Sequence, residues 1–355
     1  MTSLAERLKV EIAATGPMSV AAYMTRCLHD PLDGYYATRP ALGERGDFIT
    51  APLVSQMFGE LLGLWSAQIW AAMGSPPRVR LVELGPGDGT MMTDILRAAR
   101  AVPTFQAAIE VWLVDQSGPL RAAQAEALRD HDIRWAASLS DLPADLPLII
   151  LANEFLDCLP VSQFVKTSGG WKERRVGLDD DGALAFGLAP GPGFLMAGDQ
   201  PLGCVFSQSA ALANAAIAVS RLTAATPCAA LFIDYGGLAD CFGDTLQALR
   251  GHAKEHALAH PGEADLTVRV DFSAFIDMAV ADGAAAAPLV TQAAFLRALG
   301  VEARAAALTA RNPDRAALVR RQLDRLIGED QMGELFKACC LHSPGLAPPG
   351  FETAP

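Results

Sequence analysis

A glycine-rich turn carries the clearest chemical signal in this chain. It reads ELGPGDG over residues 83–89 and follows the apolar run VRLVEL. The glycine spacing is GxGxG. Thr90 stands where the GxGxxG fingerprint of dinucleotide-binding proteins requires its third glycine. Glycines permit a tight turn and a close approach of the backbone to a ligand. Together with Glu83, the turn at Gly85, Gly87 and Gly89 predicts a site for a ligand that carries a positive group and no pyrophosphate.

A second acid ends the next predicted strand. Asp115 closes the run IEVWLVD, about one strand–helix–strand unit after the glycine turn, and Gln116 follows it. An acid at this position accepts hydrogen bonds from ribose hydroxyls. The alternative is that Asp115 caps the following helix. The GxGxG turn and the acid together are typical of S-adenosylmethionine sites, so the sequence predicts S-adenosylmethionine as the cofactor, bound by both groups of residues.

Polar side chains also follow the fourth predicted strand, PLIILA. Asn153, Glu154 and Asp157 stand beside this apolar run, where polar groups need a polar partner. Methyl transfer is an in-line displacement, which requires a positioned nucleophile and a group that handles its proton. A carboxylate can hold a guanidinium through two hydrogen bonds. Glu154 and Asp157 are therefore the predicted catalytic residues, with Asn153 near the cofactor; the alternative is that either acid caps a helix.

The elements that must position these residues alternate between short apolar runs and amphipathic segments. This order predicts an α/β fold, a Rossmann-like methyltransferase sheet of seven strands with at least five parallel. Residues 1–75 are expected to form a helical extension and a cofactor-covering loop, and 76–355 the methyltransferase domain. Within that domain, insertions at about 161–206, an antiparallel meander, and 238–290 are expected to cover the substrate.

Composition limits the partners. The 355 residues are 51% hydrophobic and 19% charged, with a formal net charge of −12. Such an acidic chain gains little from a phosphate backbone, so no nucleic acid is expected, and a basic protein segment fits better. No apolar run reaches the length of about 18 residues expected of a membrane span. Seven cysteines without CxxC spacing indicate reduced thiols and a cytoplasmic location.

With these residues in view, the chain resembles the MidA-like family, which includes the arginine methyltransferase that assembles mitochondrial complex I. The resemblance covers almost the whole chain and is carried by segments such as RGDFIT (45–50), VELGPGDGTMMTDIL (82–96), LANEFLDCLPVSQF (151–164), IDYGG (233–237) and DLTVRVDF (265–272).

The resemblance implies a protein substrate with an exposed arginine, expected on the bacterial counterpart of a complex I matrix-arm subunit. It also implies that Gly46, Asp47 and Thr50 help to close the cofactor site. Two alternatives stay open at this stage. One is a non-catalytic assembly chaperone that retains cofactor binding, and the other is a small-molecule methyltransferase.

One motif points to different chemistry. Residues 252–256 read HAKEH, which matches the HxxEH pattern of zinc peptidases, and His260 extends the spacing. On a helix these histidines would share a face. A solvated helix end is the favoured interpretation, and no metal is predicted; a polar role for His252 near the cleft stays open.

Overall fold

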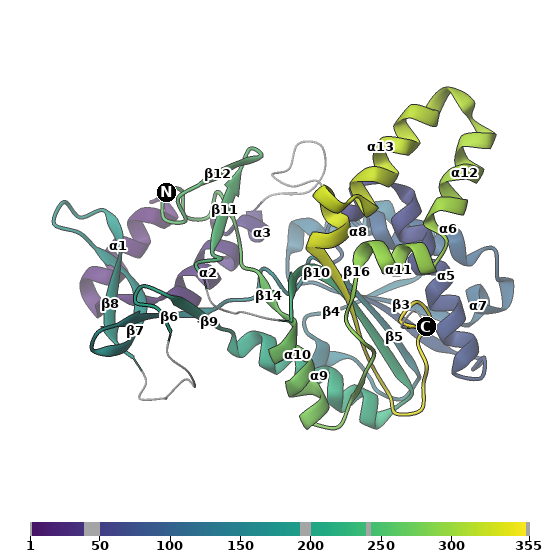
Figure 1. The fold of residues 1–355 in the computed structure, drawn as a ribbon, viewed down its shortest axis with the longest axis horizontal. Helices are drawn as coiled ribbons and strands as arrows, with labels where there is room; N and C mark the ends of the chain where they lie inside the picture. The colour runs from purple at the N-terminus through teal and green to yellow at the C-terminus, as the bar shows by residue number, and fades with distance from the viewer. Residues whose placement is uncertain (1, 39–49, 192–199, 239–242, 353–355) are drawn as a thin grey trace.

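The main body of the protein is a mixed sheet with helices on both faces (Figure 1). The computed structural model describes residues 2–38, 50–191, 200–238 and 243–352. Seven strands follow one another across the sheet in the order β15 (Ala285–Ala286), β17 (Phe336–His342), β10 (Cys228–Gly237), β5 (Leu148–Asn153), β2 (Val79–Leu84), β3 (Ile109–Val114) and β4 (Ile133–Ala136). The strands from β10 to β4 are parallel, and β17 runs antiparallel to β10.

The predicted α/β class is confirmed. The strand count is larger than predicted, because β14 (Val270–Asp271) pairs with β10 and β16 (Val290–Thr291) pairs with β17, which makes nine strands. Both extra strands have two residues and carry no hydrophobic run of their own. The sequence could therefore not show them as strands.

Strand β5 shows why its sequence is almost entirely apolar. Side chains alternate between the two faces of a strand, and both faces are covered here. Ile149 and Leu151 lie in one hydrophobic core, while Leu148, Ile150 and Ala152 lie in another.

Two sets of helices cover these faces. The first core contains residues of α5 (Gln56–Ala72), α6 (Thr90–Ala99), α7 (Pro103–Ala108), α11 (Gln292–Ala298), α12 (Val301–Arg311) and α13 (Ala316–Ile327). The second contains residues of α9 (Ala210–Ala225) and α10 (Phe272–Ala281). Helix α8 (Gly118–Ala127) lies between β3 and β4 in the chain.

A smaller lobe lies beside the carboxyl ends of the parallel strands, on the left in Figure 1. Its helices are α1 (Leu4–Thr15), α2 (Val20–His29) and α3 (Tyr35–Thr38). Its larger sheet contains β1 (Met18–Ser19), β6 (Ser162–Thr167), β7 (Gly170–Leu178), β8 (Leu184–Pro190) and β9 (Val205–Gln208), and its smaller sheet contains β11 (Gln247–Arg250), β12 (Ala253–Glu255) and β13 (Asp265–Thr267). One hydrophobic core, with Leu8, Val176 and Leu266 among its members, joins the three parts.

The division of the chain differs from the expected ranges in two places. Helix α5, inside the expected N-terminal extension, packs on the main sheet with α6. Helix α10, inside the expected second insertion, also packs on the main sheet, where Phe275 contacts Phe232 of β10 at 4.9 Å between ring centroids. The smaller lobe is therefore built from the first 38 residues and the parts of both insertions that precede α9 and α10.

Candidate active site

The glycine turn follows β2 directly and leads into α6. Gly85, Gly87 and Gly89 have φ values of +60°, +55° and +87°, a backbone region that residues with a Cβ rarely adopt. A Cβ on Gly85 would also lie 3.1 Å from the ring of Phe155. Gly85 and Gly87 line a cavity of about 900 Å³, whereas Gly89 caps the first turn of α6 and does not line it.

This cavity lies at the carboxyl ends of β2, β3 and β5, where the smaller lobe approaches the sheet. In an open α/β sheet, ligands bind at this edge, where the strand order reverses between β2 and β5. The predicted residues that line it are Thr50, Glu83, Gly85, Gly87, Asp115, Gln116, Asn153, Glu154 and Asp157. Gly46 and Asp47 lie outside the described residues. Apart from these two and Gly89, the structure brings all of the predicted site residues together.

Glu83 is the last acid before the turn, and its carboxyl group is buried with one oxygen that lacks a hydrogen-bond partner. Its side chain is 2% exposed, and Oε2 has no hydrogen-bond partner. Burial raises the pKa of the Glu83 carboxyl well above its usual range, and the nearby charges of Asp88 and Asp115 raise it further. An orphaned carboxylate oxygen beside a glycine cradle fits a ligand with a positively charged N–H group.

Asp115 is fixed by two hydrogen bonds. Its Oδ1 accepts the backbone N–H of Ser117 at 2.8 Å, and its Oδ2 accepts Nε2 of Gln124 at 2.7 Å. The cap of α8 is Ser117, whose Oγ accepts the N–H of Leu120, so Asp115 is not the helix cap. Gln124 Nε2 also donates to the carbonyl of Gly87 at 2.8 Å. This buried glutamine links the glycine turn to Asp115, and the sequence analysis missed it.

Two neighbouring residues complete this end of the cavity. Gln116 is exposed and donates through Nε2 to the carbonyl of Ala137 at 3.1 Å. Thr50 precedes α4 (Ala51–Val54) and does not cap it through its side chain. Both side chains border the cavity with polar groups.

At the end of β5, Glu154 is held in an unusual backbone conformation. Its φ is +52°, which is rare for a residue with a side chain, and strained backbone of this kind clusters at functional sites. Glu154 Oε1 accepts Nδ2 of Asn153 at 2.9 Å and the backbone N–H of Ala51 at 3.2 Å. Burial raises the pKa of Glu154, and these bonds and the charge of Arg325 partly oppose the rise. Oδ1 of Asn153 is buried without a partner, which leaves an acceptor at the cavity wall.

Asp157 belongs to a group of buried acids. Burial raises the pKa of Asp157 well above its usual range, and the charges of Asp234, Asp265 and Glu154 raise it further. Burial likewise raises the pKa of Asp234 to about 7. No helix begins at Glu154 or Asp157, since the next regular element is β6. The helix-cap interpretation of these two acids is therefore wrong.

The sequence analysis missed Asp234 as an organiser of this segment. Asp234 is 1% exposed, and its carboxylate accepts the N–H groups of Leu156 at 2.8 Å, Asp157 at 3.2 Å and Tyr235 at 2.8 Å. Its position near the end of an apolar strand, in IDYGG, was the available signal, as it was for Asp115.

Tyr36 and Asp265 were also missed, and they come from the smaller lobe. Tyr36 donates its hydroxyl to Oδ1 of Asp265 at 2.8 Å, and its backbone carbonyl accepts Oγ of Ser117 at 2.6 Å. Both residues line the cavity. Tyr36 thus connects the strand end that carries Asp115 to the acids on the opposite side.

The charge of the cavity wall is one-sided. Among the described residues that line it are six carboxylates and no lysine or arginine; the acids are Glu83, Asp88, Asp115, Glu154, Asp157 and Asp265. Burial lowers the pKa of His29, the histidine among these lining residues, which favours its neutral ring. Such a wall binds cations and disfavours phosphate groups.

The HxxEH segment is not a helix. Gly251 and His252 have φ values of +57° and +62° and form the two-residue turn between β11 and β12. His260 Nδ1 lies 2.9 Å from a carboxylate oxygen of Glu255, and the ring of His256 lies 5.7 Å from that of Phe186 between centroids in a tilted arrangement. In the described parts of the chain, no group of three or more His, Cys, Asp or Glu side chains is arranged to hold a metal ion. None of the described helices is long and apolar enough to cross a membrane.

A parallel sheet of this order, a glycine turn after β2 and an acid after β3 define a Rossmann-like methyltransferase. The chain matches the model of the S-adenosyl-L-methionine-dependent methyltransferase family 28 (MidA-like) over residues 61–290, and it belongs to this family. The protein is an S-adenosylmethionine-dependent methyltransferase. When bound, that cofactor supplies a methyl group activated on a positively charged sulfur, and the orphaned Glu83 oxygen and the glycine cradle fit it.

Curated relatives and a solved structure agree with this assignment. The protein arginine methyltransferase NDUFAF7 of Danio rerio is 36% identical, with 94% of this chain and 86% of the relative covered. The human protein of the same name is 35% identical, with 95% of this chain and 82% of the relative covered. A crystal structure from Burkholderia thailandensis, bound to S-adenosyl-homocysteine, is 30% identical, has a TM-score of 0.85, and covers 99% of this chain and 93% of that one.

Proposed function

We propose that this enzyme methylates an arginine side chain of a protein. The observation that carries the proposal is the excess of carboxylates around the cavity, with no lysine or arginine among the described residues that line it. Glu83, Asp88 and Asp115 lie at the end expected to hold the cofactor, whereas Glu154 and Asp157 follow β5. A guanidinium would supply the positive charge that pairs with Glu154 and Asp157. The names of the relatives point to the same substrate class.

At the cofactor end, we assign Glu83 to the ammonium group and Asp115 to the ribose hydroxyls. The anchoring of Asp115 by Ser117 and Gln124 leaves each of its oxygens with a further lone pair for the ligand. Gly85 and Gly87 let the backbone approach the cofactor without steric conflict.

At the substrate end, we assign Glu154 and Asp157 to the guanidinium. A carboxylate there holds the planar group through paired hydrogen bonds and draws its positive charge away from the attacking nitrogen. The same carboxylates, whose pKa values are raised, can accept the proton that the nitrogen releases. Glu154 is the first choice because it directly follows the apolar strand β5, and Asp157 is the second.

The partner that we propose is the bacterial counterpart of the complex I matrix-arm subunit, methylated in the cytoplasm. Six described cysteines are free thiols, which suits a reducing compartment. Cell fractionation of a tagged chain tests the location, and its appearance in an oxidising compartment would overturn that part of the proposal.

The test of the substrate is mass spectrometry of this subunit from wild-type, deletion and Glu154→Gln strains. The variant keeps the shape of the side chain and removes its charge. Transfer should fall by about a hundredfold, the usual effect of losing a positioned electrostatic group, while cofactor affinity changes little. If the arginine carries the same methylation in all three strains, the substrate assignment is wrong.

A further inference from the structure

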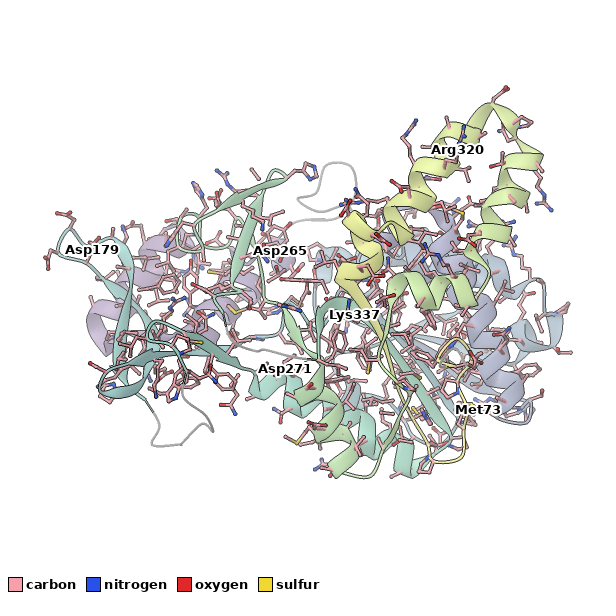
Figure 2. All side chains as sticks on the ribbon, in the orientation of Figure 1. Met73, Asp179, Asp265, Asp271, Arg320 and Lys337 are labelled. Carbon is pink, nitrogen blue, oxygen red and sulfur yellow. The ribbon has the colours of Figure 1, made fainter. Side chains whose placement is uncertain are left out.

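The helical hairpin of α12 and α13 is basic in an otherwise acidic protein. Residues 301–327 contain six arginines against three acids, a formal charge of +3, while the whole chain carries −12. The hairpin projects from the body of the molecule, and Arg320 lies on its projecting part (Figures 1 and 2). The hairpin therefore has the opposite charge to the protein as a whole.

Most of these arginines do not stabilise the hairpin. Arg304 binds Glu60 at 2.7 Å and thereby anchors the base of α12. In contrast, Arg311, Arg315, Arg320 and Arg321 are exposed, and none of them makes a hydrogen bond or ion pair within the described parts of the chain. Their charges are therefore available to a partner.

Helix α13 packs beside one wall of the cavity. Helix α13 packs against α4, whose Pro52 and Leu53 line the cavity. The positive charge of Arg325 lowers the pKa of Glu154 and so opposes part of the rise that burial causes. Arg321 lies one turn from Arg325 on the same face, and the exposed Leu318 lies one turn beyond it. These three residues, Leu318, Arg321 and Arg325, span about 10 Å along the helix, and we refer to them as the arginine ridge.

We propose that the arginine ridge binds acidic residues that flank the methylated site of the protein substrate. The inference rests on the proposed function, since it concerns the same substrate. A segment whose target side chain enters the acidic cavity must continue over the rim of that cavity. The ridge offers two positive charges and one apolar contact there, which complement an acidic stretch and repel a basic one. The enzyme would thus select an arginine in an acidic neighbourhood, in contrast to the basic segment that the net charge of the whole chain favours.

The probes for this proposal are two fluorescent peptides of about 20 residues with one central arginine. One carries a block of glutamates on each side of the arginine, and the other carries glutamines in their place. Fluorescence anisotropy in the presence of S-adenosyl-homocysteine measures binding, and mass spectrometry separately measures methyl transfer to each peptide. Wild-type protein should bind the glutamate peptide about tenfold more tightly at low salt, and the preference should shrink as salt rises.

The decisive variants change one charge each. Arg321→Glu should abolish the preference, Arg321→Lys should keep most of it, and Arg221→Glu, an exposed site on α9 with the same change in net charge, should leave it intact. An unchanged preference in Arg321→Glu, or no preference in the wild type, overturns the proposal. A ridge-dependent preference without methyl transfer supports the ridge and counts against arginine methylation. Equal methyl transfer to both peptides, unchanged by Arg321→Glu, supports arginine methylation and counts against the ridge.

Discussion

Replacing Glu83 by Gln is expected to have opposite effects on stability and on cofactor binding. In the free protein the Glu83 carboxylate is buried, has one unpaired oxygen and lies near the charges of Asp88 and Asp115. An amide of the same shape removes that repulsion, so the free variant should be more stable than the wild type. A bound ammonium group compensates the carboxylate, and the variant loses this interaction.

The size of the loss follows from the kind of bond. A hydrogen bond to a charged group contributes about 1.5–3 kcal/mol. Since each 1.4 kcal/mol is a factor of ten, the dissociation constant for S-adenosylmethionine should rise by roughly 10- to 150-fold. Calorimetric titration measures the affinity, and thermal unfolding of the free protein measures the stability. Glu126→Gln, at an exposed position on α8, is the matched control and should change neither quantity.

The dependence on pH gives a second check. A carboxyl whose pKa is raised in the folded state holds its proton more tightly there than in the unfolded chain, so stability falls as pH rises from its ordinary pKa of about 4.5 through the raised value. This loss should be smaller in Glu83→Gln. Cofactor affinity should increase over the same range in the wild type, because binding needs the ionised form. A variant that is less stable when free, or that binds the cofactor as tightly as the wild type, refutes this account of Glu83.

Three further changes test the rest of the site. Asp115→Ala should weaken cofactor binding by about 1.5–3 kcal/mol in calorimetry, because it removes the charged acceptor for the ribose hydroxyls; unchanged affinity would exclude that role. Gly87→Val should abolish cofactor binding while the protein stays folded by circular dichroism, since the side chain would fill the space of the ligand and strain a positive φ. Tyr36→Phe removes the 2.8 Å hydrogen bond to Asp265 and should lower the rate of methyl transfer about tenfold with unchanged S-adenosyl-homocysteine affinity, and a normal rate would make that bond dispensable.

The cofactor half of the site was predictable because its residues lie close together in the sequence. The glycine turn and Asp115 belong to one strand–helix–strand unit, and local rules decide its geometry. The same holds for Glu154 and Asp157, which follow one apolar strand.

The other half depends on contacts between distant segments. Tyr36 meets Asp265 across 229 positions of the chain, and no local pattern links the two. Helix α10 was missed because its exposed side carries the apolar residues Met278 and Val280, so FSAFIDMAVA shows no clear amphipathic pattern, although Asp271 caps it through the N–H of Ala274. In HAKEH the spacing suggested a helix, but Gly251 before it favours the positive φ of a hairpin turn, and that local preference decides the structure.

The acidic cavity also bears on how the two ligands and the product are handled. Burial raises the pKa values of Glu83, Glu154 and Asp157, and neighbouring carboxylates add to the rise for Glu83 and Asp157, so ionising these acids has a cost in the absence of a positive ligand. Each positive ligand that binds lowers this cost for the acids near the other, so cofactor and a cationic substrate should bind cooperatively. After transfer the cofactor has lost the positive charge on its sulfur. The carboxylates then hold it less strongly by the same electrostatic argument, which favours exchange of the product for a new cofactor molecule.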